Sequence, residues 1–348
     1  MFMKSFASDN YAGAIPEVME AIVAENQSHK PAYGNDNTTK LLEDTFSSLL
    51  QVPFKMHLVF NGTGANLFGL SCTIRPYSAI LCAETAHIYV DESTAPEAFL
   101  GCRLIPLPVD NNGKLTTDTI AKSIKRQGDL HHPQATTLSI AQPTEYGTLY
   151  TLEELRQIRA ITTKHGLLLH IDGARIFTAA AALGCDLKDI IAASGVDVIS
   201  IGGTKAGMLY GEAVLIFNQK CMEHSAFLHK RSMQLASKNR FIAAQFLALL
   251  RHWKTYSTLS LEKTTQLKQV LNKYKAIELT KPVEANAIFA RLPAEWIKPL
   301  QEIASFYLWE EVSQEVRLMC SFDTTEEEID RFDKKLAQLN KDSVISNS

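Results

Sequence analysis

The sequence lacks several features that place a protein quickly in a functional class. No apolar run reaches the roughly 18 residues of a membrane helix. The start, MFMKSFASDN, has no apolar core of a signal peptide, so export is not expected. The net charge of −3 gives no electrostatic reason to expect nucleic acid or an anionic membrane as a partner. Neither HExxH nor a zinc-ligand spacing occurs, so no catalytic metal is expected.

Cysteine is sparse and is never arranged as a CxxC pair. The six cysteines lie at positions 72, 82, 102, 185, 221 and 320, several of them among apolar neighbours. Such residues usually act as small core side chains, so we expect reduced thiols and a cytoplasmic protein. With 348 residues the chain is too long for one simple core. We predict a large domain over residues 1–250, which includes an N-terminal segment, and a smaller C-terminal domain over residues 251–348.

Short β-branched runs alternate with helical patterns from about residue 55 to residue 218. This alternation predicts an α/β fold with a mostly parallel seven-stranded sheet and helices on both faces. The predicted strands are His57–Phe60, Ala79–Cys82, Arg103–Pro106, Thr136–Ala141, Leu167–Ile171, Val196–Ile201 and Ala213–Phe217.

The pattern changes after about residue 243. Two helices are predicted over 241–251 and 261–274, and they are followed by strands at 287–290 and 316–321, a helix from 294 between them, and a closing acidic helix. This order predicts a smaller C-terminal α/β domain.

The stretch NGTGAN (61–66) follows a predicted strand and opens a helix. The free N–H groups of a helix N-terminus bind phosphate, and Thr63 beside Gly62 adds a hydroxyl donor. A dinucleotide-binding fingerprint is the competing interpretation. Position 67 is leucine where GxGxxG requires a third glycine, which disfavours a dinucleotide-dependent oxidoreductase.

Two further groups follow buried strands. Asp172 ends an apolar strand in HIDGARIF (170–177), where a carboxylate is costly unless it meets a cation such as a pyridinium nitrogen. Capping of the next helix or pairing with Arg175 explains it equally well. Lys205 lies on the glycine-lined turn of SIGGTKAGMLYG (200–211), where burial and nearby positive charge favour a neutral, reactive amine. Together with the phosphate turn, the two residues fit pyridoxal 5'-phosphate.

Over residues 6–333 the chain also resembles the low-specificity threonine aldolases, in the aromatic amino acid β-eliminating lyase/threonine aldolase group of fold type I pyridoxal-phosphate enzymes. The matching stretches include FASDNYAG (6–13), AYGND (32–36), NGTGAN (61–66), QPTEYGTLY (142–150), HIDGARIF (170–177), GGTKAGM (202–208) and VRLMCSFDT (316–324).

The resemblance implies a role for each matching position. Lys205 is implied to bond the cofactor, Asp172 to contact its pyridine nitrogen, and His87 to stack on its ring, while Gly62 and Thr63 lie on the phosphate turn. The implied substrate contacts are Ser8, Arg175, Arg317, His131 and Tyr33, with Arg317 clamping the carboxylate and Arg175 also near the cofactor. The basic residues Lys230, Arg231 and Lys238 either reach a phosphate or form a solvated helix face.

The implied reaction is cleavage of L-threonine or L-allo-threonine to glycine and an aldehyde, in a homotetramer with shared active sites. A phenylserine aldolase or a related β-eliminating lyase would keep every residue named. The sequence leaves open whether His87 or a histidine-held water takes the proton from the β-hydroxyl group.

Overall fold

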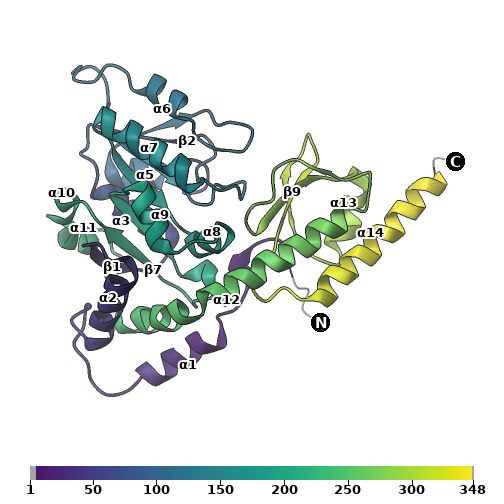
Figure 1. Ribbon diagram of the computed structural model, residues 1–348, viewed down its shortest axis with the longest axis horizontal. Coiled ribbons are helices and arrows are strands. Elements are labelled where there is room, and N and C mark those ends of the chain that lie inside the picture. Colours follow the sequence, from purple (N-terminus) through teal and green to yellow (C-terminus); the bar gives the residue numbers. More distant parts are fainter. Residues whose placement is uncertain (1–4, 347–348) are drawn as a thin grey trace.

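The computed structural model describes residues 5–346 and contains two sheets (Figure 1). The larger sheet has seven strands in the order β1-β7-β6-β5-β4-β2-β3, and only β7 runs antiparallel to its neighbours. Its strands are β1 Lys55–Val59, β2 Ser78–Ala83, β3 Arg103–Leu107, β4 Gln134–Ala141, β5 Leu168–Asp172, β6 Val198–Gly202 and β7 Glu212–Ile216. The predicted mostly parallel seven-stranded sheet is confirmed, with each strand within two residues of its predicted bounds.

Helices cover both faces of this sheet because its strands are apolar on both sides. Val198 of β6 lies in one core cluster with Phe68 of α3, whereas the next residue, Ile199, points to the other face and belongs to the core cluster that contains residues of α7, α8 and α9. The helices up to β7 and shortly after it are α1 Pro16–Glu25, α2 Asn37–Leu50, α3 Gly62–Ser71, α4 His87–Val90, α5 Ala95–Leu100, α6 Thr117–Ser123, α7 Leu152–His165, α8 Ile176–Ala182, α9 Leu187–Ser194, α10 Gln219–Met222 and α11 Ser225–Arg231.

One continuous helix, α12 (Arg240–Leu271), leads from the large sheet to the smaller one (Figure 1). The prediction of two separate helices was wrong at this point. Residues 252–260 contain neither proline nor glycine, and the small polar side chains of Ser257 and Ser260 lie on the buried face, which hid the helical period. The predicted domain boundary between residues 250 and 251 falls inside this helix and stays a prediction.

The smaller sheet is antiparallel throughout, with the strand order β10-β11-β9-β8. It consists of β8 Glu278–Leu279, β9 Ala287–Arg291, β10 Tyr307–Glu310 and β11 Glu315–Met319, and it packs with α13 Ala294–Gln301, α14 Glu326–Ser346 and the end of α12. The N-terminal segment joins this core. Phe6 is buried in it, its N–H donates to the Ser305 carbonyl at 2.8 Å, and its carbonyl accepts from the Met319 N–H at 2.7 Å.

The same N-terminal segment then runs to the large domain. After the short 3-10 helix Asp9–Tyr11, the Ile15 N–H donates to the carbonyl of Gly207 at 2.9 Å, on the turn that carries Lys205. Within residues 5–346, no helix is both long and apolar enough to span a membrane.

Candidate active site

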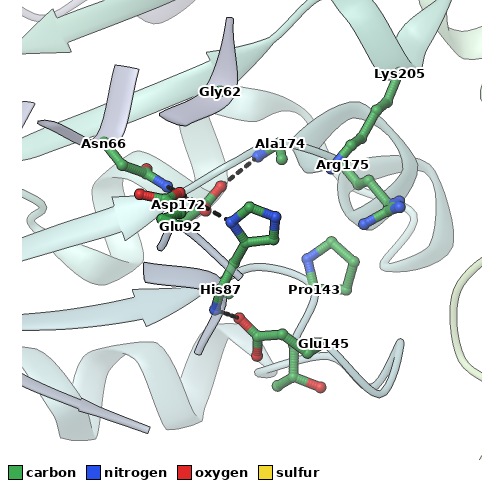
Figure 2. A pocket seen from close by; sticks show the side chains of 12 residues that line it. Gly62, Asn66, His87, Glu92, Pro143, Glu145, Asp172, Ala174, Arg175 and Lys205 are labelled. Atoms are coloured by element: carbon green, nitrogen blue, oxygen red, sulfur yellow. Dashed lines mark hydrogen bonds and ion pairs between the residues drawn. The ribbon is translucent and has the colours of Figure 1, made fainter. Parts of the chain in front are cut away.

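Five segments that follow strands of the large sheet meet in one pocket (Figure 2). The carboxyl ends of parallel strands share one edge of a sheet, which is where ligands bind in open α/β folds. The pocket is lined by Gly62 after β1, His87 after β2, Glu145 after β4, Asp172 at the end of β5 and Lys205 after β6. The structure thus brings together Lys205, Asp172, His87, Gly62 and Arg175 from the predicted site.

Lys205 lies in the short 3-10 helix Thr204–Ala206, on a turn that only glycine permits at two positions. A Cβ atom on Gly203 would lie 2.4 Å from the Met208 sulfur, and Gly207 has a φ of +112°. The positive charge of Arg175, and then burial, lower the pKa of Lys205. The turn therefore holds a lysine that gives up its proton more readily than usual.

A buried carboxyl group, that of Glu212, accepts a hydrogen bond from the backbone of this turn. Glu212 on β7 pairs with Gly202 across the sheet, and its Oε2 accepts from the Gly203 N–H at 2.5 Å. Burial raises the pKa of Glu212 to about 7, although hydrogen bonds from Thr204 and Gly203 oppose the rise. The sequence analysis missed this residue. Its only signal was a carboxylate inside an otherwise apolar strand, EAVLI.

Asp172 projects into the pocket as a charged group (Figure 2). Its Oδ2 accepts from Asn66 Nδ2 and its Oδ1 accepts from the Ala174 N–H, both at 2.9 Å. Burial alone would raise the pKa of Asp172. The Asn66 hydrogen bond and the charge of Lys205 outweigh burial, so its pKa is lowered. The carboxylate therefore stays ionised near neutral pH.

His87 is held by a second buried carboxylate, which sequence reasoning also missed. Its Nδ1 lies 2.9 Å from Oε1 of the buried Glu92, and that oxygen also accepts from Asn66 Nδ2 at 2.9 Å. The Glu92 hydrogen bond raises the pKa of His87. Asn66 thus links His87 and Asp172 through one amide, and the network fixes the imidazole in the pocket wall.

Arg175 is neutralised by an unexpected partner. Its Nε and Nη2 donate to the two carboxyl oxygens of Asp9 at 2.6 and 2.8 Å, so it does not pair with Asp172. Asp9 also accepts from Asn286 Nδ2 at 3.2 Å. Burial opposes ionisation of both partners, but the pair lowers the pKa of Asp9 and raises that of Arg175. Asp9, from the N-terminal segment, therefore fixes Arg175 beside the pocket.

Arg317 and Ser8 lie outside the set of residues that line this pocket. The Arg317 guanidinium carbon is 5.0 Å from the ring centres of both Tyr307 and Trp309, and its Nη2 donates to the Ala7 carbonyl at 3.0 Å. Burial, and then the charge of Arg175, lower the pKa of Arg317. Ser8 is buried, and its hydroxyl accepts from the Asn10 N–H at 3.2 Å.

The predicted phosphate turn forms the N-terminus of α3. Asn61 Oδ1 accepts from the Gly64 N–H at 2.7 Å, and a Cβ on Gly62 would meet nothing within 4 Å. The N–H groups of Gly62 and Thr63 belong to the first turn of the helix, where they have no partner inside the helix. Gln234, from the chain after α11, packs against this turn and accepts from the Phe60 N–H at 3.0 Å.

Tyr33 and His131 lie outside the residues that line the pocket. Tyr33 is 51% exposed, and Lys230 Nζ lies 5.0 Å from its ring centre. His131 is exposed on the loop before β4, where its N–H donates to Asp129 Oδ1 at 2.9 Å. Lys230, Arg231 and Lys238 are also exposed. Within a single chain these residues do not reach the site.

A lysine with a lowered pKa that shares a pocket with a partly buried carboxylate, at the strand ends of a mostly parallel sheet, is the arrangement of fold type I enzymes. An aspartate aminotransferase from Rhodobacter sphaeroides has the same fold. The two are 16% identical with a TM-score of 0.72, over 98% of this chain and 94% of that one. At this identity the likeness concerns the fold alone.

The chain belongs to the β-eliminating lyase family, whose model matches residues 5–294. It is 36% identical to a low specificity L-threonine aldolase of a Pseudomonas species, over 93% of this chain and 94% of that protein. The corresponding Saccharomyces cerevisiae protein is 29% identical over 84% of this chain and 75% of its own length. A solved threonine aldolase from Leishmania major matches with a TM-score of 0.91 at 29% identity, covering 97% of this chain and 99% of that one.

Proposed function

We propose that the pocket binds pyridoxal 5'-phosphate. Lys205 would bond its carbonyl carbon, Asp172 would hold its pyridine nitrogen, and the N-terminus of α3 with Gly62 and Thr63 would take its phosphate. The residues present fit this group, because an ionised, partly buried carboxylate suits a pyridinium and the space in front of Gly62 is open. His87 lines the same pocket and would lie against the ring.

The proposed reaction is cleavage of L-threonine and L-allo-threonine to glycine and acetaldehyde. When bound, this group would supply a sink for the electron pair that the broken Cα–Cβ bond leaves on the substrate. The chain supplies orientation: Arg317 would bind the carboxylate, with Ser8 and Arg175 nearby, while Asp172 maintains the positive charge of the ring nitrogen. Because Arg175 is already paired with Asp9, Arg317 is the principal carboxylate ligand in this proposal.

One observation carries the proposal: Lys205 with its lowered pKa and the ionised Asp172 face the same pocket, in a chain 36% identical to a named L-threonine aldolase. The test is an absorbance spectrum with added pyridoxal phosphate, followed by borohydride reduction and peptide mapping. Glycine and acetaldehyde release is then measured for the four threonine stereoisomers. We expect the label on Lys205 and cleavage of the two L isomers. A protein that takes up no cofactor contradicts the proposal.

The proposed assembly is a homotetramer in which active sites are shared between subunits. Tyr33 and His131 support it, because both are exposed in a single chain although the sequence resemblance implies that they contact substrate. The stacked rings of Phe60 and Tyr210, 6.4 Å apart and partly exposed beside the phosphate turn, add apolar surface that a second subunit would cover. Light scattering at assay concentration tests this, and an active monomer would rule it out.

The alternative activities differ in how well they fit the site. Phenylserine cleavage or β-elimination would use the same residues, and turnover assays with those substrates separate them from threonine cleavage. A dinucleotide-dependent oxidoreductase does not account for the lysine that faces Asp172. The compartment, proposed to be the cytoplasm, is tested by fractionation of the source cells.

A further inference from the structure

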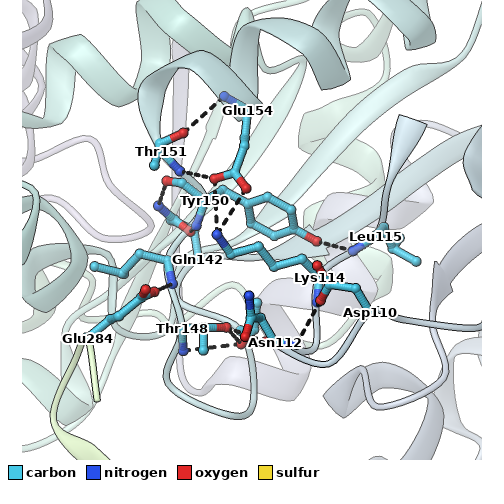
Figure 3. Close-up of polar contacts among 12 residues, drawn as sticks. Asp110, Asn112, Lys114, Leu115, Gln142, Thr148, Tyr150, Thr151, Glu154 and Glu284 are labelled. Carbon is cyan, nitrogen blue, oxygen red and sulfur yellow. Dashed lines mark hydrogen bonds and ion pairs between the residues drawn. The ribbon is translucent and has the colours of Figure 1, made fainter. Parts of the chain in front are cut away.

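Glu145 is fixed in the pocket wall by a rigid loop. It lies between Gln142 and Tyr150, which exchange two hydrogen bonds: Gln142 Nε2 donates to the Tyr150 carbonyl at 2.8 Å, and the Tyr150 N–H donates to Gln142 Oε1 at 3.0 Å (Figure 3). Inside the loop, the hydroxyl groups of Thr144 and Thr148 lie 2.6 Å apart. These contacts hold the backbone of the loop that carries Glu145.

The carboxyl group of Glu145 contacts His87, which also lines the pocket. Its Oε1 accepts from the His87 N–H at 3.0 Å, and both side chains line the cavity with Asp172 and Lys205 (Figure 2). Sequence reasoning noted QPTEYGTLY only as a matching stretch and gave Glu145 no role.

The surroundings of Glu145 favour a proton that moves near neutral pH. Burial of the carboxyl group, together with the negative charge of Asp172, raises its pKa to about 7, against hydrogen bonds from the backbone and the charge of His87. The other titratable groups that interact with it come from the neighbouring elements: Cys82 of β2, Tyr146 and Tyr150 of its own loop, and Arg175 before α8.

The pKa values of His87 and Glu145 are both raised, and the consequence differs because one group is an imidazole and the other a carboxyl group. Glu92 raises the pKa of His87, so the imidazole tends to keep a proton. The raised pKa of Glu145 makes it a stronger base than an ordinary carboxylate, while a large share stays ionised at neutral pH. A general base works best when its pKa lies near the operating pH, which favours Glu145 over a histidine that keeps its proton. His131, the other histidine considered, is exposed outside this pocket.

We infer that Glu145 is the base that takes the proton from the β-hydroxyl group of the substrate. This assignment rests on the proposed aldolase activity. The O–H bond breaks and its proton passes to the Glu145 carboxylate, while the O–H electron pair becomes the second bond of the aldehyde carbonyl. The Cα–Cβ bond breaks, its electron pair stays with the Cα side, and Cα later takes a proton to give glycine.

The test replaces the carboxylate while keeping its hydrogen bond. In the holoenzyme, Glu145→Gln retains an oxygen that accepts from the His87 N–H. We expect kcat for L-threonine to fall on the order of 10²- to 10⁴-fold, the usual share of a general base. Exchange of the glycine α-proton with solvent deuterium needs the cofactor but no β-hydroxyl proton, so it should stay within about threefold of the parent. Glu84→Gln, an exposed carboxyl after β2, is the matched control and should change neither rate.

The pH profile gives a second readout. For the parent, kcat/KM for L-threonine should rise as the pH increases through about 7, because the ionised form of Glu145 is the base. This rise of kcat/KM on the acid side of the profile, the acid limb, should be missing in Glu145→Gln. It should persist in Glu212→Gln, which removes a carboxyl of similar pKa that does not line the pocket.

Three outcomes would overturn the inference. They are normal threonine cleavage by Glu145→Gln, an unchanged acid limb in its pH profile, or equal losses of cleavage and α-proton exchange, which would mark a structural role. A parent enzyme that exchanges the glycine α-proton but cleaves no β-hydroxy amino acid would instead contradict the proposed aldolase function.

Discussion

Two histidine sites lie on either side of α3, one in the pocket wall and one in the core, and they hold their protons in opposite ways. In the pocket, His87 faces the carboxylate of Glu92, which raises its pKa. In the core behind β1, His57 and His229 face each other with their Nδ1 atoms 3.2 Å apart. Burial, and then the neighbouring His229, lower the pKa of His57 to about 3. Burial also lowers the pKa of His229.

The difference teaches that burial alone does not mark a functional group. His229 Nε2 lies 2.9 Å from the Leu58 carbonyl and donates to it, so in the neutral ring His229 Nδ1 can only accept a hydrogen bond from His57. A second proton would set two donors against each other. The pair therefore stays neutral and stabilises packing, whereas groups that face a cavity and an opposite charge keep a charge that a ligand can use.

The largest effect separating the two regions is expected in the pocket. Asp172→Asn removes the charge opposite the pyridine nitrogen but leaves an oxygen to accept from Asn66. We expect kcat to fall on the order of 10²- to 10³-fold, as for removal of one electrostatic stabiliser. The free energy of unfolding should change little. Steady-state kinetics of cofactor-loaded protein and urea unfolding measure the two quantities, and near-normal turnover would contradict the role of Asp172.

The converse change in the core should affect stability and spare turnover. His57→Leu leaves His229 Nδ1 without its donor in a buried place. An unsatisfied buried polar group costs about 1–3 kcal/mol. Urea unfolding should show this loss, while kcat per folded enzyme stays within about twofold. His224→Ala, at an exposed position, is the control and should lie within about 0.5 kcal/mol of the parent. If His57→Leu instead lowered kcat strongly and left the free energy of unfolding nearly unchanged, the distinction between the two regions would be wrong.

The pH dependence of the free energy of unfolding is expected to show a smaller effect. Its sign should differ between the two regions. The pKa of His57 is lower in the folded than in the unfolded protein, so its contribution is present above about 6.5 and is lost as the pH falls toward about 3. The pKa of His87 is raised, so its contribution is present below about 6.5 and is lost as the pH rises through its folded value.

Urea unfolding of the cofactor-free protein between about pH 4.5 and 8 checks these signs, with at most about 1.4 kcal/mol per pH unit for each proton. His57→Leu should flatten the loss of stability on the acid side. His87→Asn should flatten the dependence near neutral pH in the other direction. If the free energy of unfolding had the same slope against pH in both variants, the partners of His57 and His87 would not explain the difference between the two regions.

Sequence reasoning reached the parts of the site that local patterns specify. Asp172 and Lys205 follow apolar strands directly, so their place at the sheet edge follows from the parallel topology. Partners that are distant in sequence gave no such signal. Asp9 meets Arg175 across 166 positions, and nothing in the N-terminal stretch indicates that contact.

The same limit applies to the small sheet and to the shifted pKa values. β10 (YLWE) is exposed along its whole length and shows no alternation, so the rings that flank Arg317 were not expected there. The raised pKa of Glu145 depends on burial and on Asp172, which only the folded arrangement supplies.

The N-terminal segment has a consequence for how the protein matures during synthesis. Phe6 is held by Ser305 and Met319, and Asp9, three positions later, completes the pair with Arg175. Phe6 thus waits for partners that are translated about 300 positions later, and such long-range closure comes late in folding. A nascent chain therefore has its lysine turn and its large sheet before the contacts of Phe6, which are complete only after residue 319 has emerged.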